Sequence, residues 1–115
     1  MGFLILLALT SALSIQAPAP NAAPRGDADA GKKLYESRGC WQCHGTVAQG
    51  GGGGARLAPR PMAWPAFSKY VRHPTADMIP YTAKMLPEQE LADIYAFLLT
   101  IPPPPPVDSI PLLKN

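Results

Sequence analysis

Apolar and polar positions divide the chain into segments with different patterns. Residues 3–17 are mostly apolar, whereas residues 27–39 place their apolar side chains at helical spacing and end at a glycine, a common helix stop. Residues 91–98 carry the stripe of an amphipathic helix. Loops that contain glycine and proline separate these segments. The pattern therefore predicts a small all-α domain of three to four helices.

Local signals indicate where the helices begin and end. Asp27 or Asp29 can cap the first helix, because a carboxylate accepts hydrogen bonds from the free N–H groups of a first turn. Pro65 suits a first turn and Pro74 ends a helix before it, which predicts a short helix between them. A last helix is expected over residues 87–100, with glutamates in its first turn, where the helix dipole favours negative charge.

The two ends of the chain differ from the domain between them, which we place at residues 27–101. Residues 1–17 are predicted to be an export signal, because the apolar run is shorter than the about 20 residues that cross a bilayer. It departs from the usual signal in having no basic residue before the apolar run. Residues 18–26 are expected to form an extended spacer. Residues 102–115 begin with five prolines, a stiff segment, and end in an apolar tail. This tail is expected either to fold back over the domain or to bind elsewhere.

Length and charge limit the function. The chain has 115 residues, fifteen prolines and a net charge of +2, which allows one domain whose apolar core is marginal. Its basic residues are spread out, so no nucleic-acid surface is indicated. A local excess of basic residues in the middle of the chain is either solvated surface or a rim that steers an acidic partner. Its members are Arg56, Arg60, Lys69, Arg72 and Lys84.

Candidate chemistry is concentrated in the pentapeptide Cys40-Trp41-Gln42-Cys43-His44. Cysteines at i and i+3 lie on one side of a helical turn, so both thiols can form thioethers with the two vinyl groups of one porphyrin. His44 then presents its imidazole to the iron. The pattern C-x-x-C-H is that of covalent c-type haem attachment. A bound macrocycle would also supply the apolar surface that so small a domain lacks.

Other interpretations of these cysteines fit less well. A thioredoxin-like redox pair needs a neighbouring strand–helix–strand pattern, and no strand-like alternation flanks this one. A zinc site needs four ligands, of which only His73 could join the motif, and adjacent Cys43 and His44 are poorly placed to bind one tetrahedral ion. A plain disulfide would leave His44 without a role. Haem attachment also agrees with export, because c-type haem is attached outside the bacterial cytoplasm, and it predicts a periplasmic protein. Residues 50–54, all glycine, predict a flexible loop beside the haem.

In order, these segments resemble a class I cytochrome c across residues 27–101. The resemblance rests on the C-x-x-C-H motif, on Met78-Ile79-Pro80-Tyr81, and on the stripe at residues 91–98. It implies the small cytochrome c fold, with three to four helices packed around one covalently attached haem.

The same resemblance implies a close crossing of the first and last helices. In the family a glycine of the first helix meets an aromatic residue of the last. The matching residues are Gly31 and Tyr35 in the first helix, and Ile94 and Phe97 in the last. Glycine has no side chain, so it lets the two backbones approach.

The resemblance also indicates what orients the haem-binding histidine. In the family a proline carbonyl in a Gly-Pro-x-Leu segment accepts a hydrogen bond from the second ring nitrogen. The corresponding segment here is Gly54-Ala55-Arg56-Leu57, so the Ala55 carbonyl is expected to accept this bond from a less rigid turn. Arg56 and Trp64 are candidate neighbours of the haem propionates, with a surface or a core role as the alternative for each.

The second iron ligand is chosen by the same comparison. The family places it in a loop before the last helix, with proline close behind, and Met78 matches this position although the usual Pro-Pro is Ile79-Pro80 here. Met85 is interpreted as packing, and Met62 is separated from the loop by a helix. His73 ends a short helix and is interpreted as a surface residue.

Ligation by His44 and Met78 implies an electron carrier rather than an enzyme. Both axial positions are then filled, the reduction potential is raised, and one electron passes through an exposed haem edge that Trp41 covers. The expected donor is a periplasmic dehydrogenase and the acceptor an oxidase or another cytochrome, with the chain free or a subunit of the dehydrogenase. No membrane span is expected after processing. The alternatives are a haem enzyme or gas sensor with an open or displaceable distal site, and a structural subunit whose tail binds a partner.

Overall fold

The computed structural model describes residues 21–113, which fold into four α-helices followed by two short 3-10 turns. The elements are α1 (Ala28–Ser37), α2 (Cys40–His44), α3 (Trp64–Arg72), α4 (Glu88–Thr100), η1 (Val107–Ser109) and η2 (Pro111–Leu113). The described residues form no β-strand, and the expected all-α fold is confirmed. The predicted export signal, residues 1–17, lies outside the described residues, as does the first part of the predicted spacer. Within residues 21–113, no helix combines the length and the apolar character needed to cross a membrane.

The first helix ends where the cysteine motif begins. Asp27 is its cap, since its side chain accepts hydrogen bonds from the backbone N–H groups of Asp29 and Ala30, both at 2.9 Å. Of the two candidates, Asp29 lies inside the first turn instead. Gly39 follows the helix with φ of 79°, the left-handed conformation that glycine adopts without strain. The chain turns there and enters α2 at Cys40.

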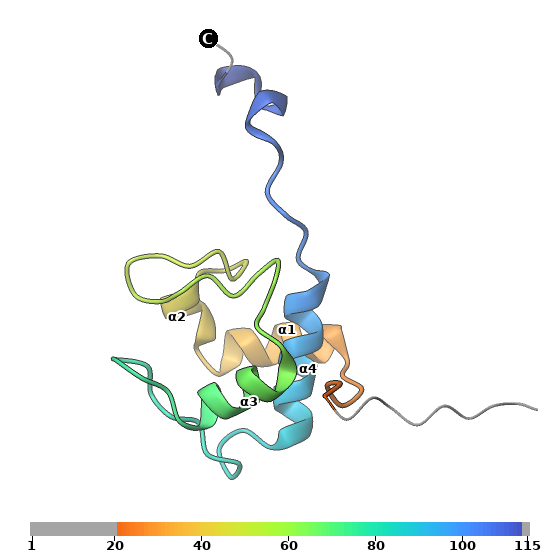
Figure 1. Ribbon diagram of the computed structural model, residues 1–115, viewed down its shortest axis with the longest axis vertical. Coiled ribbons are helices and arrows are strands. Elements are labelled where there is room, and N and C mark those ends of the chain that lie inside the picture. The colour runs from red at the N-terminus through yellow and green to blue at the C-terminus, as the bar shows by residue number, and fades with distance from the viewer. Residues whose placement is uncertain (1–20, 114–115) are drawn as a thin grey trace, which may run out of the picture.

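Helices α1 and α4 cross near the centre of the domain (Figure 1). Gly31 lies at the crossing, where a Cβ atom would overlap the carbonyl group of Asp93. Tyr35 packs against Phe97 with their ring centroids 5.5 Å apart. The crossing implied by the family resemblance is therefore confirmed. The backbone group nearest to Gly31 is the carbonyl of Asp93, one residue before Ile94.

A buried carboxylate connects the beginning of α1 to α4. Asp93 is 9% exposed, and its Oδ1 accepts hydrogen bonds from the backbone N–H of Asp27 and from Nε2 of Gln89, each at 2.9 Å. The same Nε2 atom donates to the Arg25 carbonyl at 2.8 Å. The segment before α1 is thus held against α4, which the sequence pattern did not indicate.

Helix α3 packs against α4 through aromatic side chains. The ring of Tyr95 lies 5.4 Å from that of Trp64 and 5.0 Å from that of Phe67, centroid to centroid, and all three residues are buried. The Tyr95 hydroxyl donates to the Met62 carbonyl at 3.1 Å, which satisfies the one polar atom of this cluster's central ring. Trp64 therefore belongs to the core, one of the roles left open for it, and a place beside the haem propionates stays a prediction.

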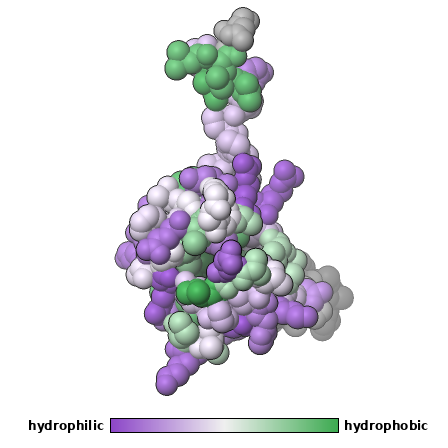
Figure 2. All heavy atoms as spheres, turned by 90° about the vertical axis from the view of Figure 1, so that its left-hand side faces the viewer, coloured by the Kyte–Doolittle hydropathy of each residue, from purple (hydrophilic) through white to green (hydrophobic). Residues whose placement is uncertain are grey.

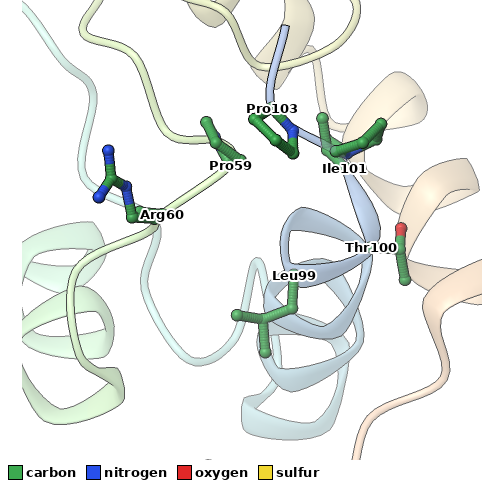
Figure 3. A pocket seen from close by; sticks show the side chains of 7 residues that line it. Pro59, Arg60, Leu99, Thr100, Ile101 and Pro103 are labelled. Carbon is green, nitrogen blue, oxygen red and sulfur yellow. The ribbon is translucent and has the colours of Figure 1, made fainter. Parts of the chain in front are cut away.

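Beyond α4 the chain leaves the domain as an extended segment and ends in the two 3-10 turns (Figure 1). The side chains of Val107, Leu112 and Leu113 are exposed, Leu112 to 93%. Figure 2 shows them as a green apolar group at the tip, separated from the body by the pale prolines. At the base, a groove of about 430 Å³ lies between Pro59 and Arg60 on one side and residues 99–103 on the other (Figure 3). The tail projects from the domain and does not cover it.

Candidate haem site

Helix α2 consists of the C-x-x-C-H motif alone, so both cysteines lie on one helical turn as expected. Cys40 is partly buried and packs against the core, whereas Cys43 is exposed. Both thiols are free of disulfide bonds. Among residues 21–113, no three or more His, Cys, Asp or Glu side chains are arranged to hold a metal ion, so the zinc interpretation has no ligand set.

The imidazole of His44 is oriented by the carbonyl of Ala55. Its Nδ1 lies 2.7 Å from that oxygen. A carbonyl oxygen can only accept a hydrogen bond, so Nδ1 carries a proton, and Nε2 is the nitrogen with the free lone pair in the neutral ring. This is the form of histidine that ligates a metal. The hydrogen bond to Ala55, expected from the family resemblance, is confirmed.

The loop that supplies this carbonyl is tied back onto α2. The backbone N–H of Gly50, whose φ is 79°, donates to the His44 carbonyl at 2.8 Å. At the other end of the loop, the backbone N–H groups of Leu57 and Ala58 donate to the carbonyl of buried Ala48, at 2.9 and 3.1 Å. The loop was predicted to be flexible because of its glycines. These bonds instead fix both of its ends, and so fix the position of the carbonyl between them.

A tyrosine of α1 supports the end of the haem-attachment turn. The hydroxyl of Tyr35, which is fully buried, donates to the Gly45 carbonyl at 2.7 Å. Burial raises the pKa of Tyr35, so the hydroxyl keeps its proton and remains a donor at physiological pH. The sequence indicated Tyr35 only as a packing residue at the helix crossing. Its hydroxyl adds a direct connection between that crossing and the cysteine turn.

Cys40 and Tyr81 share a partly buried environment on the cysteine side of the site. Burial raises the pKa of the Cys40 thiol to about 11, against a smaller lowering by a backbone hydrogen bond and by Arg38. The pKa of Tyr81 is raised by burial first, then by the nearness of Cys40 and Cys43, while Arg38 lowers it. Before haem attachment, Cys40 is therefore a neutral thiol at neutral pH. No role was expected for Tyr81 from the sequence, although it directly follows Pro80 in the segment that contains Met78.

Of the three methionines among the described residues, Met78 alone packs against the core. It is partly buried, whereas Met62 and Met85 are 46% and 49% exposed. His73 is exposed at the end of α3, in agreement with the surface role expected for it. Burial supports Met78 as the second iron ligand, and that role stays a prediction.

The basic residues in the middle of the chain are not all on the surface. Arg72 is turned inward, and its Nη1 donates to the Tyr81 carbonyl at 2.9 Å. Arg56 is exposed, and its Nε donates to the Gln49 carbonyl at 3.3 Å. The basic rim considered from the sequence is therefore reduced to the four exposed members of the set, Arg56, Arg60, Lys69 and Lys84.

These residues fit a covalently attached haem. Two thiols stand on one helical turn, an imidazole follows with its metal-binding nitrogen unprotonated, and a partly buried thioether lies in a loop that packs against the core. Imidazole and sulfur ligands both suit haem iron.

Comparison with known families agrees with this donor set. Residues 26–98 match the family described as "Cytochrome C oxidase, cbb3-type, subunit III". The matched segment is well over half of the chain and contains α1, α2, α3 and most of α4. Among curated proteins and solved structures, none matches the chain.

Proposed function

This chain belongs to the c-type cytochrome family described as "Cytochrome C oxidase, cbb3-type, subunit III", and we propose that it carries one electron at a time through a single haem. Membership of the family implies covalently bound haem c and haem-based electron transfer. The proposal adds the ligands, with His44 and Met78 as the residues that would bind the iron. It also adds the place, the bacterial periplasm, and the route, from a periplasmic dehydrogenase to the respiratory chain.

The hydrogen bond from His44 Nδ1 to the Ala55 carbonyl is the observation that carries this proposal. It directs the unprotonated Nε2 to serve as a ligand, next to the two cysteines that would hold the group as thioethers. When bound, the haem supplies an iron that changes its charge by one electron. The bond also makes the imidazole a stronger electron donor, because a partly shared Nδ1 proton leaves more charge on the ring.

Ligation of the iron by Met78 would make the protein an electron carrier rather than a haem enzyme. If the Met78 thioether held the iron together with His44, it would exclude other ligands from its coordination position, and the haem would supply electron transfer without bond-making at the iron. Histidine–methionine ligation also raises the reduction potential relative to other axial pairs. Trp41 is 43% exposed on the same turn as the cysteines, which supports the proposal that it would cover an edge of the haem.

The proposed route rests on two observations. The matched family is described by the name of an oxidase subunit, which supports an oxidase, or a cytochrome that serves one, as the acceptor. The apolar run at residues 3–17 supports export, the condition for c-type haem attachment in bacteria. A periplasmic dehydrogenase is the proposed donor, with the chain acting either alone or as its cytochrome subunit.

Covalent haem is tested by mass. The full-length chain would be produced in a host able both to export it and to attach c-type haem. We expect the purified protein to carry the mass of one added haem, and the double variant Cys40→Ser/Cys43→Ser to carry none. A wild-type product with the mass of the polypeptide alone would overturn the proposal.

The ligand is tested by spectroscopy, because sulfur bound to ferric iron produces a weak charge-transfer band near the red end of the visible range. Met78→Ala should abolish this band and lower the reduction potential. Met85→Ala, the matched control in the same region, should leave the band intact. The opposite result would assign the ligand to Met85. A wild-type protein without the band would instead support the haem enzyme or gas sensor with an open distal position.

A further inference from the structure

Tyr81 uses all of its polar atoms in contacts with two other segments of the chain. Its hydroxyl donates to the Arg38 carbonyl at 2.9 Å. Its backbone N–H donates to the Val71 carbonyl at 3.0 Å, and its carbonyl accepts from Arg72 Nη1 at 2.9 Å. One residue therefore connects the end of α1 to the end of α3.

The two backbone contacts close the loop that contains Met78. The loop leaves α3 after Arg72 and returns to the last turn of α3 at Tyr81, so residues 73–80 form a loop with joined ends. Arg72, half-buried, also extends its Nη2 to within 3.7 Å of Glu88 Oε2 at the beginning of α4. The base of the loop is thus fixed to two helices.

The hydroxyl contact makes a different connection. Arg38 caps the end of α1 and is separated from Cys40 only by Gly39. Among the side-chain hydrogen bonds of residues 21–113, the one from Tyr81 to Arg38 is the only one that joins the loop at residues 73–86 to the segment leading into the cysteine turn. It therefore ties the Met78 loop directly to the segment that leads into the cysteine turn.

We propose that Tyr81 is a positioning residue, which holds the Met78 loop against the cysteine–histidine turn through the Arg38 carbonyl. The inference rests on the proposed role of Met78 as iron ligand. Tyr81 itself does not bind the iron. It keeps the loop closed, so that the Met78 thioether remains in place and an external ligand finds the distal position occupied.

Removing the hydroxyl should raise the population of the open loop. The apparent affinity of an external ligand scales with the fraction of molecules in which the loop is open. The net contribution of one hydrogen bond corresponds to about a 2- to 10-fold change in such an equilibrium. Tyr81→Phe removes only this bond, since the ring and both backbone contacts remain.

The experiment titrates the oxidised haem protein with imidazole and follows the loss of the sulfur–iron band. For Tyr81→Phe we expect the apparent imidazole affinity to rise about 2- to 10-fold over wild type. Tyr70→Phe is the matched control, because its hydroxyl bonds Thr75 Oγ1 at 2.8 Å, a contact that joins the loop to α3 and does not reach α1. The apparent imidazole affinity of Tyr70→Phe should stay within about 2-fold of wild type, because the bond between Tyr70 and Thr75 does not join the loop to α1.

A thermal melt of each protein separates positioning from general destabilisation. A lower melting temperature in Tyr81→Phe with unchanged imidazole affinity would overturn the inference, as would equal increases in affinity for Tyr81→Phe and Tyr70→Phe. If the wild-type protein lacks the sulfur–iron band, the ligand role of Met78 fails and the positioning role fails with it. If the band is present and Tyr81→Phe binds imidazole like wild type, only the positioning role fails.

Discussion

Gly54 lies where the glycine loop passes close to the haem-attachment turn. A Cβ atom at this position would be 2.9 Å from the Cys43 carbonyl oxygen and 3.0 Å from His44 Nδ1. The next residue, Ala55, supplies the carbonyl that orients His44. A side chain at position 54 would therefore push the loop away from the ring that it holds. The absence of a side chain is what allows the hydrogen bond to form.

We predict that Gly54→Ala weakens the orientation of His44. The loop must move by several tenths of an ångström, at a cost of about 1–3 kcal/mol in folding free energy. Loss of the hydrogen bond makes the imidazole a weaker donor, so the reduction potential should rise. Thermal unfolding and a redox titration of the haem protein measure the two effects.

Gly52→Ala is the control for this prediction, because a Cβ atom there meets nothing within 4 Å. It should leave both the melting temperature and the potential close to wild type. Equal effects of the two substitutions would show that the glycines matter only for the flexibility of the loop.

On the scale of helices, the crossing of α1 and α4 sets the frame to which the site is attached. Gly31 is buried in the middle of α1, where glycine costs an isolated helix about 0.5–1 kcal/mol relative to alanine. The crossing reverses this preference, because a Cβ atom would overlap the Asp93 carbonyl of α4. Packing and helix propensity therefore predict opposite signs for the same substitution.

Gly31→Ala should consequently destabilise the protein. We expect a loss of about 1–3 kcal/mol in the free energy of unfolding, since two backbones must separate. Urea unfolding of the haem protein is the measurement. Lys32→Ala, one residue further on an exposed face of α1, is expected to change stability by no more than about 0.5 kcal/mol. An increase in stability with Gly31→Ala would contradict the close crossing.

At the scale of the whole molecule, the tail is set apart from the domain. Ile101 is the last residue that packs against the core, and the chain beyond it exposes its apolar side chains at the tip (Figure 2). A polyproline segment is stiff and loses little entropy when it is held extended. We therefore predict that the tail contacts a neighbouring protein and does not stabilise its own domain.

Truncation after Pro102 tests this interpretation. Because no core contact is lost, the melting temperature and the visible spectrum should remain unchanged. The rate of reduction by the proposed donor, a periplasmic dehydrogenase, should fall if the tail docks on that donor. A lower melting temperature with an unchanged reduction rate would show that the tail belongs to the fold.

Much of the architecture follows from short-range pattern. Apolar spacing and proline positions were sufficient to place α1, α3 and α4, since each helix is specified by residues three or four apart. Asp27 was one of two capping candidates, and the backbone geometry selected it. The C-x-x-C-H motif forms its own helical turn, and the relation of its cysteines was predictable for the same reason.

The sequence by itself thus determined the helices, the haem-attachment turn and, through resemblance to a family, the Gly31 crossing and the Ala55 carbonyl. Tertiary structure alone decided the contacts of Asp93 with Asp27, 66 residues apart, and of Tyr81 with Arg38, 43 residues apart. It also turned Arg72 inward, away from the basic surface expected of it. The physical reason is that a hydrogen bond between distant segments depends on the path of the loops that bring its two atoms together. That path is set by packing over the whole domain, and no local pattern of apolar and polar residues encodes it.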